Sequence, residues 1–100
     1  MLVGAPVSAS LRGMTLHQTL VELAEEHLTR MAVVPWAAFA ASIRNGKAGE
    51  TFGCEVEGRY FDVGDQASWL EAPEGSVLLV CHATTEDADP VERRAVIPRT

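Results

Sequence analysis

The chain has 100 residues, of which 47% are hydrophobic, and this length and composition suit a single hydrophobic core. Fourteen acidic and eight basic residues give a net charge of −6, and the basic residues are scattered along the chain. Nucleic acids and anionic membranes are bound through clusters of Lys and Arg, so the composition argues against both as direct partners. The sequence also contains no apolar run of the roughly 18–20 residues that a membrane-spanning helix needs.

Cysteine usage points to a reducing compartment. Cys54 and Cys81 are the two cysteines, and each lies within an apolar, strand-like segment. We interpret both as small buried hydrophobes, with a disulfide between them as the second option. Because the first residues also lack the basic region of a secretory signal, we expect a cytoplasmic protein.

The amino-terminal third of the chain predicts a tail followed by a helix. Residues 1–13 are rich in small and turn-forming types and are predicted to be a tail or an irregular edge segment. One α+β domain is predicted over 14–98. Its first helix should run from about 16 to 30, since Thr15 and Gln18 have the spacing of a capping box.

A second helix is predicted directly after the first. It should begin near Pro35, a residue suited to the first helical turn, and end at Asn45-Gly46. Its apolar residues recur at helical spacing as Trp36, Phe39, Ala40 and Ile43. The two helices should therefore form an αα-hairpin.

After Glu50 the apolar period changes from about 3.6 to 2, which predicts strands. The segments 52–56 and 59–63 alternate in polarity, and a two-residue turn at 57–58 would join them as a hairpin. In that register Cys54 lies opposite Phe61, and the apolar side chains of both strands share one face.

The rest of the chain predicts a connector and two further strands. Gly64-Asp65 is expected to start the connector, with Asp65 capping a short helical turn. The segment 76–83 is apolar at both parities as far as Cys81. This strand should therefore be central and covered on both faces, or covered on one face by a second copy of the protein. The segment 92–97 is the last predicted strand.

These elements predict an α+β fold. We expect the N-terminal αα-hairpin to pack on one face of an antiparallel sheet of three to four strands.

The residues that carry chemistry form no recognisable catalytic pattern. Cys81 and His82 are neighbours in a strand, so their side chains should point to opposite faces and cannot act as a nucleophile and its base. His27 lies in the apolar stripe of the first helix and is interpreted as a core histidine that donates to a carbonyl, or as a histidine at the edge of a groove. Asp62 and Asp65 are interpreted as part of a solvated turn. No metal site and no cofactor is predicted.

The sequence favours a small acidic, non-enzymatic interaction protein, such as an adaptor, an inhibitor or an immunity-like protein, that binds another protein. A homodimer is a further option. The predicted interface residues are mainly acidic: Glu55, Glu57, Trp69, Glu86, Asp87 and Asp89. The alternative is a small ligand-binding or catalytic domain with a cleft between helix and sheet. Its candidate residues are His17, His27, Asp62 and Asp65. A pocket that holds a histidine within hydrogen-bond distance of a carboxylate would favour this alternative.

Overall fold

A computed structural model describes residues 15–100, so the tail predicted at 1–13 lies outside the described residues. Within these residues, two helices are followed by four strands. In chain order they are α2 (Leu16–Met31), α3 (Trp36–Arg44), β1 (Gly49–Val56), β2 (Arg59–Trp69), β3 (Val77–Thr84) and β4 (Val91–Ile97).

Both predicted helices are present, with the predicted ends. The Thr15 side chain accepts a hydrogen bond from the backbone of Gln18, and the Gln18 side chain accepts one from the Thr15 backbone, which confirms the capping box of α2. Pro35 is the cap residue before α3. Gly46 follows the end of α3 with a φ of 70°, the left-handed conformation that glycine adopts readily.

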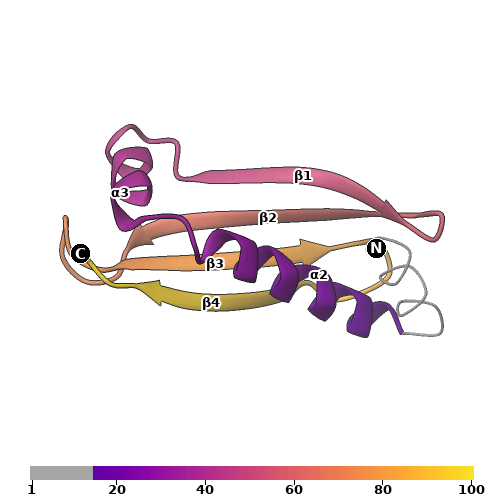
Figure 1. Cartoon of the computed structure of the whole chain (residues 1–100). Helices are drawn as coiled ribbons and strands as arrows, with labels where there is room; N and C mark the ends of the chain where they lie inside the picture. The colour runs from indigo at the N-terminus through magenta and orange to yellow at the C-terminus, as the bar shows by residue number, and fades with distance from the viewer. Residues whose placement is uncertain (1–14) are drawn as a thin grey trace.

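The four strands form one antiparallel sheet in the order β1-β2-β3-β4, so each strand pairs with its neighbours in the chain. Figure 1 shows α2 and α3 on the same face of this sheet, with α2 running across β3 and β4. The predicted α+β architecture is therefore confirmed, with four strands.

The β1–β2 hairpin has the predicted register. Cys54 pairs with Phe61 across a two-residue turn at Glu57-Gly58. Both turn residues have positive φ, 52° and 80°, as a type I′ hairpin turn requires. Glycine suits the second position because it has no Cβ to strain this conformation.

The predicted connector at Gly64-Asp65 is wrong, because β2 continues without a break to Trp69. Gly64 and the polar residues around it resemble a loop in isolation, but β1 and β3 hold this stretch on both sides. A Cβ at Gly64 would lie 2.5 Å from the Glu50 carbonyl oxygen and 2.7 Å from the His82 ring. Tertiary pairing therefore overrides weak strand propensity here, and glycine permits the close approach.

Side-chain parity separates a helix-covered face of the sheet from an open face. On β3 the odd-numbered residues are buried beneath the helices, and the even-numbered residues are half-buried on the open face. The covered face holds the core, in which the largest fully buried side chains include Leu20, Phe61 and Leu79. Cover of β3 by the fold is thus confirmed for one face. The described part of the chain places no helix on the other, and cover by a second copy stays a prediction.

The two tryptophans pack together at the end of the sheet near α3. Trp36 is buried and its Nε1 donates a hydrogen bond to the Gly75 carbonyl, while Trp69 is half-buried at a ring-centroid distance of 6.2 Å. Cys54 and Cys81 are both free thiols, and the sheet order places β2 between their strands. No described helix has the length and apolar character to cross a membrane.

Candidate functional site

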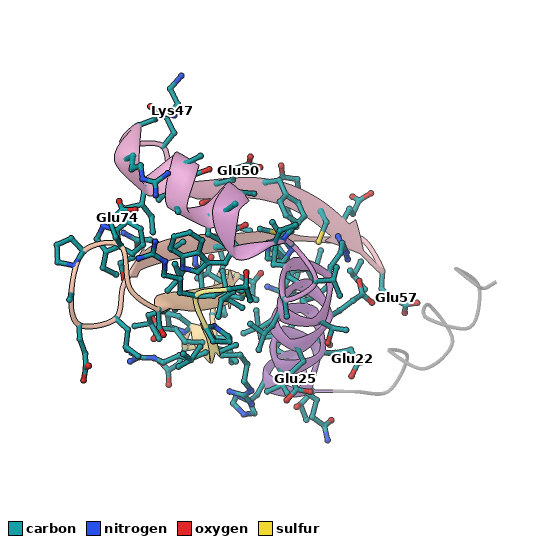
Figure 2. The ribbon with its side chains drawn as sticks, turned by 60° about the vertical axis from the view of Figure 1, so that its left-hand side comes forward. Glu22, Glu25, Lys47, Glu50, Glu57 and Glu74 are labelled. Atoms are coloured by element: carbon teal, nitrogen blue, oxygen red, sulfur yellow. The ribbon has the colours of Figure 1, made fainter. Side chains whose placement is uncertain are left out.

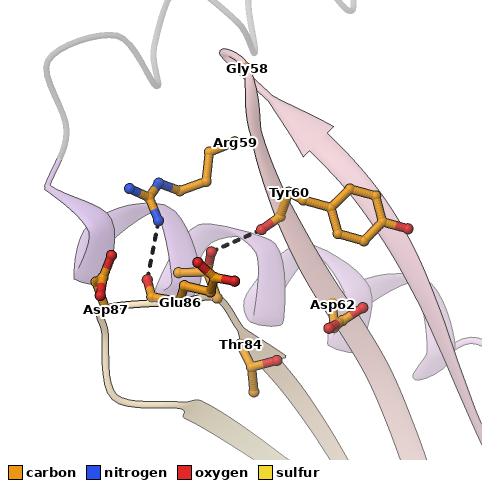
Figure 3. A pocket seen from close by; sticks show the side chains of 8 residues that line it. Gly58, Arg59, Tyr60, Asp62, Thr84, Glu86 and Asp87 are labelled. Carbon is orange, nitrogen blue, oxygen red and sulfur yellow. Dashed lines mark hydrogen bonds between the residues drawn. The ribbon is translucent and has the colours of Figure 1, made fainter.

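A surface depression lies at the end of the sheet where the β1–β2 turn and the β3–β4 loop are side by side (Figure 3). We call it the hairpin-end groove. It has a volume of about 570 Å³ and is lined by Gly58, Arg59, Tyr60, Asp62, Thr84, Thr85, Glu86 and Asp87. In a sheet whose strand order follows chain order, the first and third turns fall at the same end. The topology therefore creates this meeting of two turns.

Two hydrogen bonds hold the turns together. The Arg59 guanidinium donates to the Glu86 carbonyl oxygen at 3.1 Å, and the Thr85 hydroxyl donates to the Tyr60 carbonyl oxygen at 2.8 Å (Figure 3). The Tyr60 side chain is 66% exposed and its ring lies against Gly53 of β1. The groove thus presents a large aromatic surface on a fixed backbone.

The groove gathers acidic residues from both turns. Asp62, Glu86 and Asp87 line it, and Glu55 is the cross-strand partner of Tyr60. Arg59 is the basic lining residue. Most predicted interface residues therefore meet at one end of the sheet, where Glu57 forms part of the turn and Asp89 belongs to the same loop as Asp87. Trp69 does not join them, because it lies at the opposite end of β2 against Trp36.

A second polar arrangement lies within the core. His27 of α2 and Asp65 of β2 are joined by a hydrogen bond of 2.8 Å between Nε2 and Oδ2. Their side chains are 6% and 10% exposed. The Phe52 ring packs edge-on against the imidazole, with a centroid distance of 5.2 Å. The other imidazole nitrogen, Nδ1, is buried without a hydrogen-bond partner among the described residues.

The structure thus brings together two of the four residues proposed for a helix–sheet cleft. His17 is exposed near the start of α2, and Asp62 points to the open face of the sheet, so neither belongs to the pair. The interpretation of His27 as a histidine bonded to a carbonyl is wrong, since its partner is a carboxylate. Asp65 is a strand residue on the covered face instead of a cap in a turn.

A sequence signal for this pair existed in the apolar alternation of β2. Phe61, Val63 and Ala67 are buried at every second position, and Asp65 occupies the one polar position in that series. His27 likewise interrupts the apolar stripe of α2. A polar residue on each of two apolar stripes predicts that the two meet, because a buried polar group needs a partner. The strand predicted from the sequence ended before Gly64, so the alternation of buried residues past this position was not recognised.

The thiol nearest the pair is held in its neutral form. Cys81 is directly opposite Asp65 in the β2–β3 register and is fully buried. Burial, reinforced by the Asp65 charge, raises the pKa of the Cys81 thiol to about 11, and a protonated thiol is a poor nucleophile. His82 points to the opposite face and lies over Gly64, which confirms the predicted divergence of these two neighbours.

Within residues 15–100, no three His, Cys, Asp or Glu side chains are grouped so that they could hold a metal ion. Comparison of the chain with protein-family models, with curated proteins and with solved structures finds no match.

Proposed function

We propose that this protein is a non-enzymatic binding module whose hairpin-end groove takes a basic segment of another protein. The observation that carries the proposal is the joining of two acidic turns around one open groove beside an exposed tyrosine. Complementary charge steers such partners together and fixes their orientation.

The chemistry of the groove fits a partner segment that contains arginine. The carboxylates of Asp62, Glu86 and Asp87 accept hydrogen bonds from guanidinium groups, which can bind carboxylates through two parallel bonds. The Tyr60 ring offers a face on which a guanidinium stacks. Aromatic side chains in such positions are typical anchors of protein interfaces.

Two observations favour binding over catalysis. The Cys81 thiol has a raised pKa, and Asp65 bonds His27 within the core, where this imidazole contacts no described nucleophile. The groove is open, and its acidic residues Asp62, Glu86 and Asp87 are exposed, so a partner can reach them directly.

We further propose that the protein works in the cytoplasm. Its two free cysteines, which lie on strands separated by β2, suit a reducing compartment. A homodimer through the open face would cover the half-buried side chains of Leu78 and Val80 and is a second, separate proposal.

The test is a titration with an eight-residue peptide of alternating Arg and Ser, followed by NMR on labelled protein. We expect the backbone signals of 58–62 and 84–87 to move most. The double variant Glu86→Gln/Asp87→Asn should weaken binding about tenfold, which corresponds to about 1.4 kcal/mol. Asn is chosen because Asp87 has a φ of 65°, a conformation that Asn tolerates.

The matched control is Glu22→Gln/Glu71→Gln, which removes the same charge from exposed positions outside the groove. The control should change the affinity less than about twofold, because charges outside the site contribute mainly through the screened long-range field. Equal losses in the two double variants would mean that the peptide senses net charge alone, and the groove would then not be the site.

A further inference from the structure

A small cavity lies on the helix-covered face of the sheet, where α3 meets the beginning of β1 and the later half of β2. Its volume is about 170 Å³. The lining is mainly apolar, with Met31, Val34, Phe39, Ala48 and Ala67, and its acidic residues are Glu50 and Asp65. An apolar cavity of about 150 Å³ is large enough for benzene, so this space fits one six-membered ring.

The hydrogen bond to His27 uses one of the two carboxylate oxygens of Asp65. Oδ2 accepts the hydrogen bond from His27, and no described residue donates to Oδ1. The Asp65 side chain is 10% exposed and the residue lines the cavity, so its second oxygen could accept a hydrogen bond from an occupant.

A carboxylate that lines a mainly apolar cavity is stabilised by a hydrogen-bonding or positively charged partner. Lys47 lines the cavity mouth, but its side chain extends away into solvent in Figure 2. Glu50, the cross-strand partner of Asp65, adds a further exposed negative charge at the mouth.

We propose that this cavity binds a small apolar primary amine, with its ammonium group on Asp65 Oδ1 and its ring or alkyl body among Met31, Phe39 and Ala67. An ammonium donates hydrogen bonds and carries a charge that complements a carboxylate in apolar surroundings. An apolar molecule without a donor leaves Oδ1 unpaired when it displaces water, and an anion is repelled. The body of the ligand is limited by the cavity to about one ring.

This site is separate from the hairpin-end groove. Asp65 faces the helices, whereas Tyr60 and Asp62 face the open side of the sheet. The two sites can therefore be tested separately, and a result that disproves one proposal does not affect the other.

The test is a titration of the full chain with benzylamine, followed by NMR on labelled protein. We expect saturable shifts at Met31, Phe39, Asp65 and Ala67 with a Kd of about 1 mM, an ordinary affinity for a ligand of this size. Benzyl alcohol should bind at least tenfold more weakly, and benzoate should not bind. Benzyl alcohol binding as tightly as benzylamine would overturn the role of charge, and no saturation by about 10 mM would overturn the site.

Two variants assign the contacts. Asp65→Asn keeps the size of the side chain and should weaken benzylamine binding at least tenfold, whereas the matched Glu71→Gln, at an exposed position outside the cavity, should change it less than threefold. Ala38→Leu, at an exposed position on α3 that lines the cavity, should fill the space and abolish binding. Thermal unfolding curves establish that each variant is folded. Undiminished binding in folded Asp65→Asn or Ala38→Leu would overturn the proposal.

Discussion

The two faces of the sheet use the same four strands for different purposes. The helix-covered face buries Leu79, Cys81 and Phe61 and admits one polar pair, whereas the open face carries Tyr60 and the carboxylates of the hairpin-end groove. Successive residues of a strand alternate between the faces, so neighbours in sequence have unrelated surroundings. Parity, more than position along the chain, therefore decides whether a residue stabilises the fold or is available to a partner.

The largest expected difference is between two adjacent leucines of β3. Leu79→Ala should destabilise the protein by about 3 kcal/mol, because Leu79 is fully buried and its loss leaves a cavity. Leu78→Ala, on the open face, should cost less than about 1 kcal/mol. Chemical denaturation of both variants measures the difference. Similar losses would show that the open face is also covered, as in a homodimer.

A smaller difference is expected from the pH dependence of Cys81. Its thiol pKa is raised by burial from 9.0 to about 11 in the folded protein. Between these values the unfolded chain releases this proton and the folded chain retains it, so stability should fall by about 2–3 kcal/mol as the pH rises from below 9 to above 11. The free energy of unfolding should fall less steeply in Cys81→Ala, in which the other alkaline groups still titrate. Identical slopes would contradict this role.

The smallest difference is expected between two aspartates of β2. Asp65→Ala should destabilise by about 1–2 kcal/mol, because it leaves Nε2 of His27 buried without an acceptor. Asp62→Ala, at an exposed position on the open face, should stay within about 0.5 kcal/mol. Thermal unfolding of both variants near pH 7 compares them. If Asp65→Ala costs no more than Asp62→Ala, the buried pair contributes nothing to folding.

Local sequence patterns predict most of this fold. The Thr15 capping box, the period of α2 and the two-residue turn after Val56 involve neighbours in the chain, and each was confirmed by the structure. The extension of β2 past Gly64 could not be predicted in this way. It depends on pairing with β3, which begins eight residues after β2 ends.

The candidate sites were less accessible to sequence reasoning for the same physical reason. The His27–Asp65 pair joins residues 38 apart in the chain, and its prediction required β2 to be assigned correctly. The meeting of Glu57 and Glu86 at one end of the sheet follows from the strand order, which the sequence left open between three and four strands. Acidic residues were identifiable as candidates, but their proximity was not.

The placement of α2 has a consequence for the order of folding. Strands that pair with their chain neighbours through short turns can form hairpin by hairpin, a local topology that favours rapid folding. The helix α2, however, packs mainly on β3 and β4, which are the described strands furthest from it in the chain. During synthesis, the apolar side of α2 therefore lacks most of its packing partners until β3 and β4 have left the ribosome.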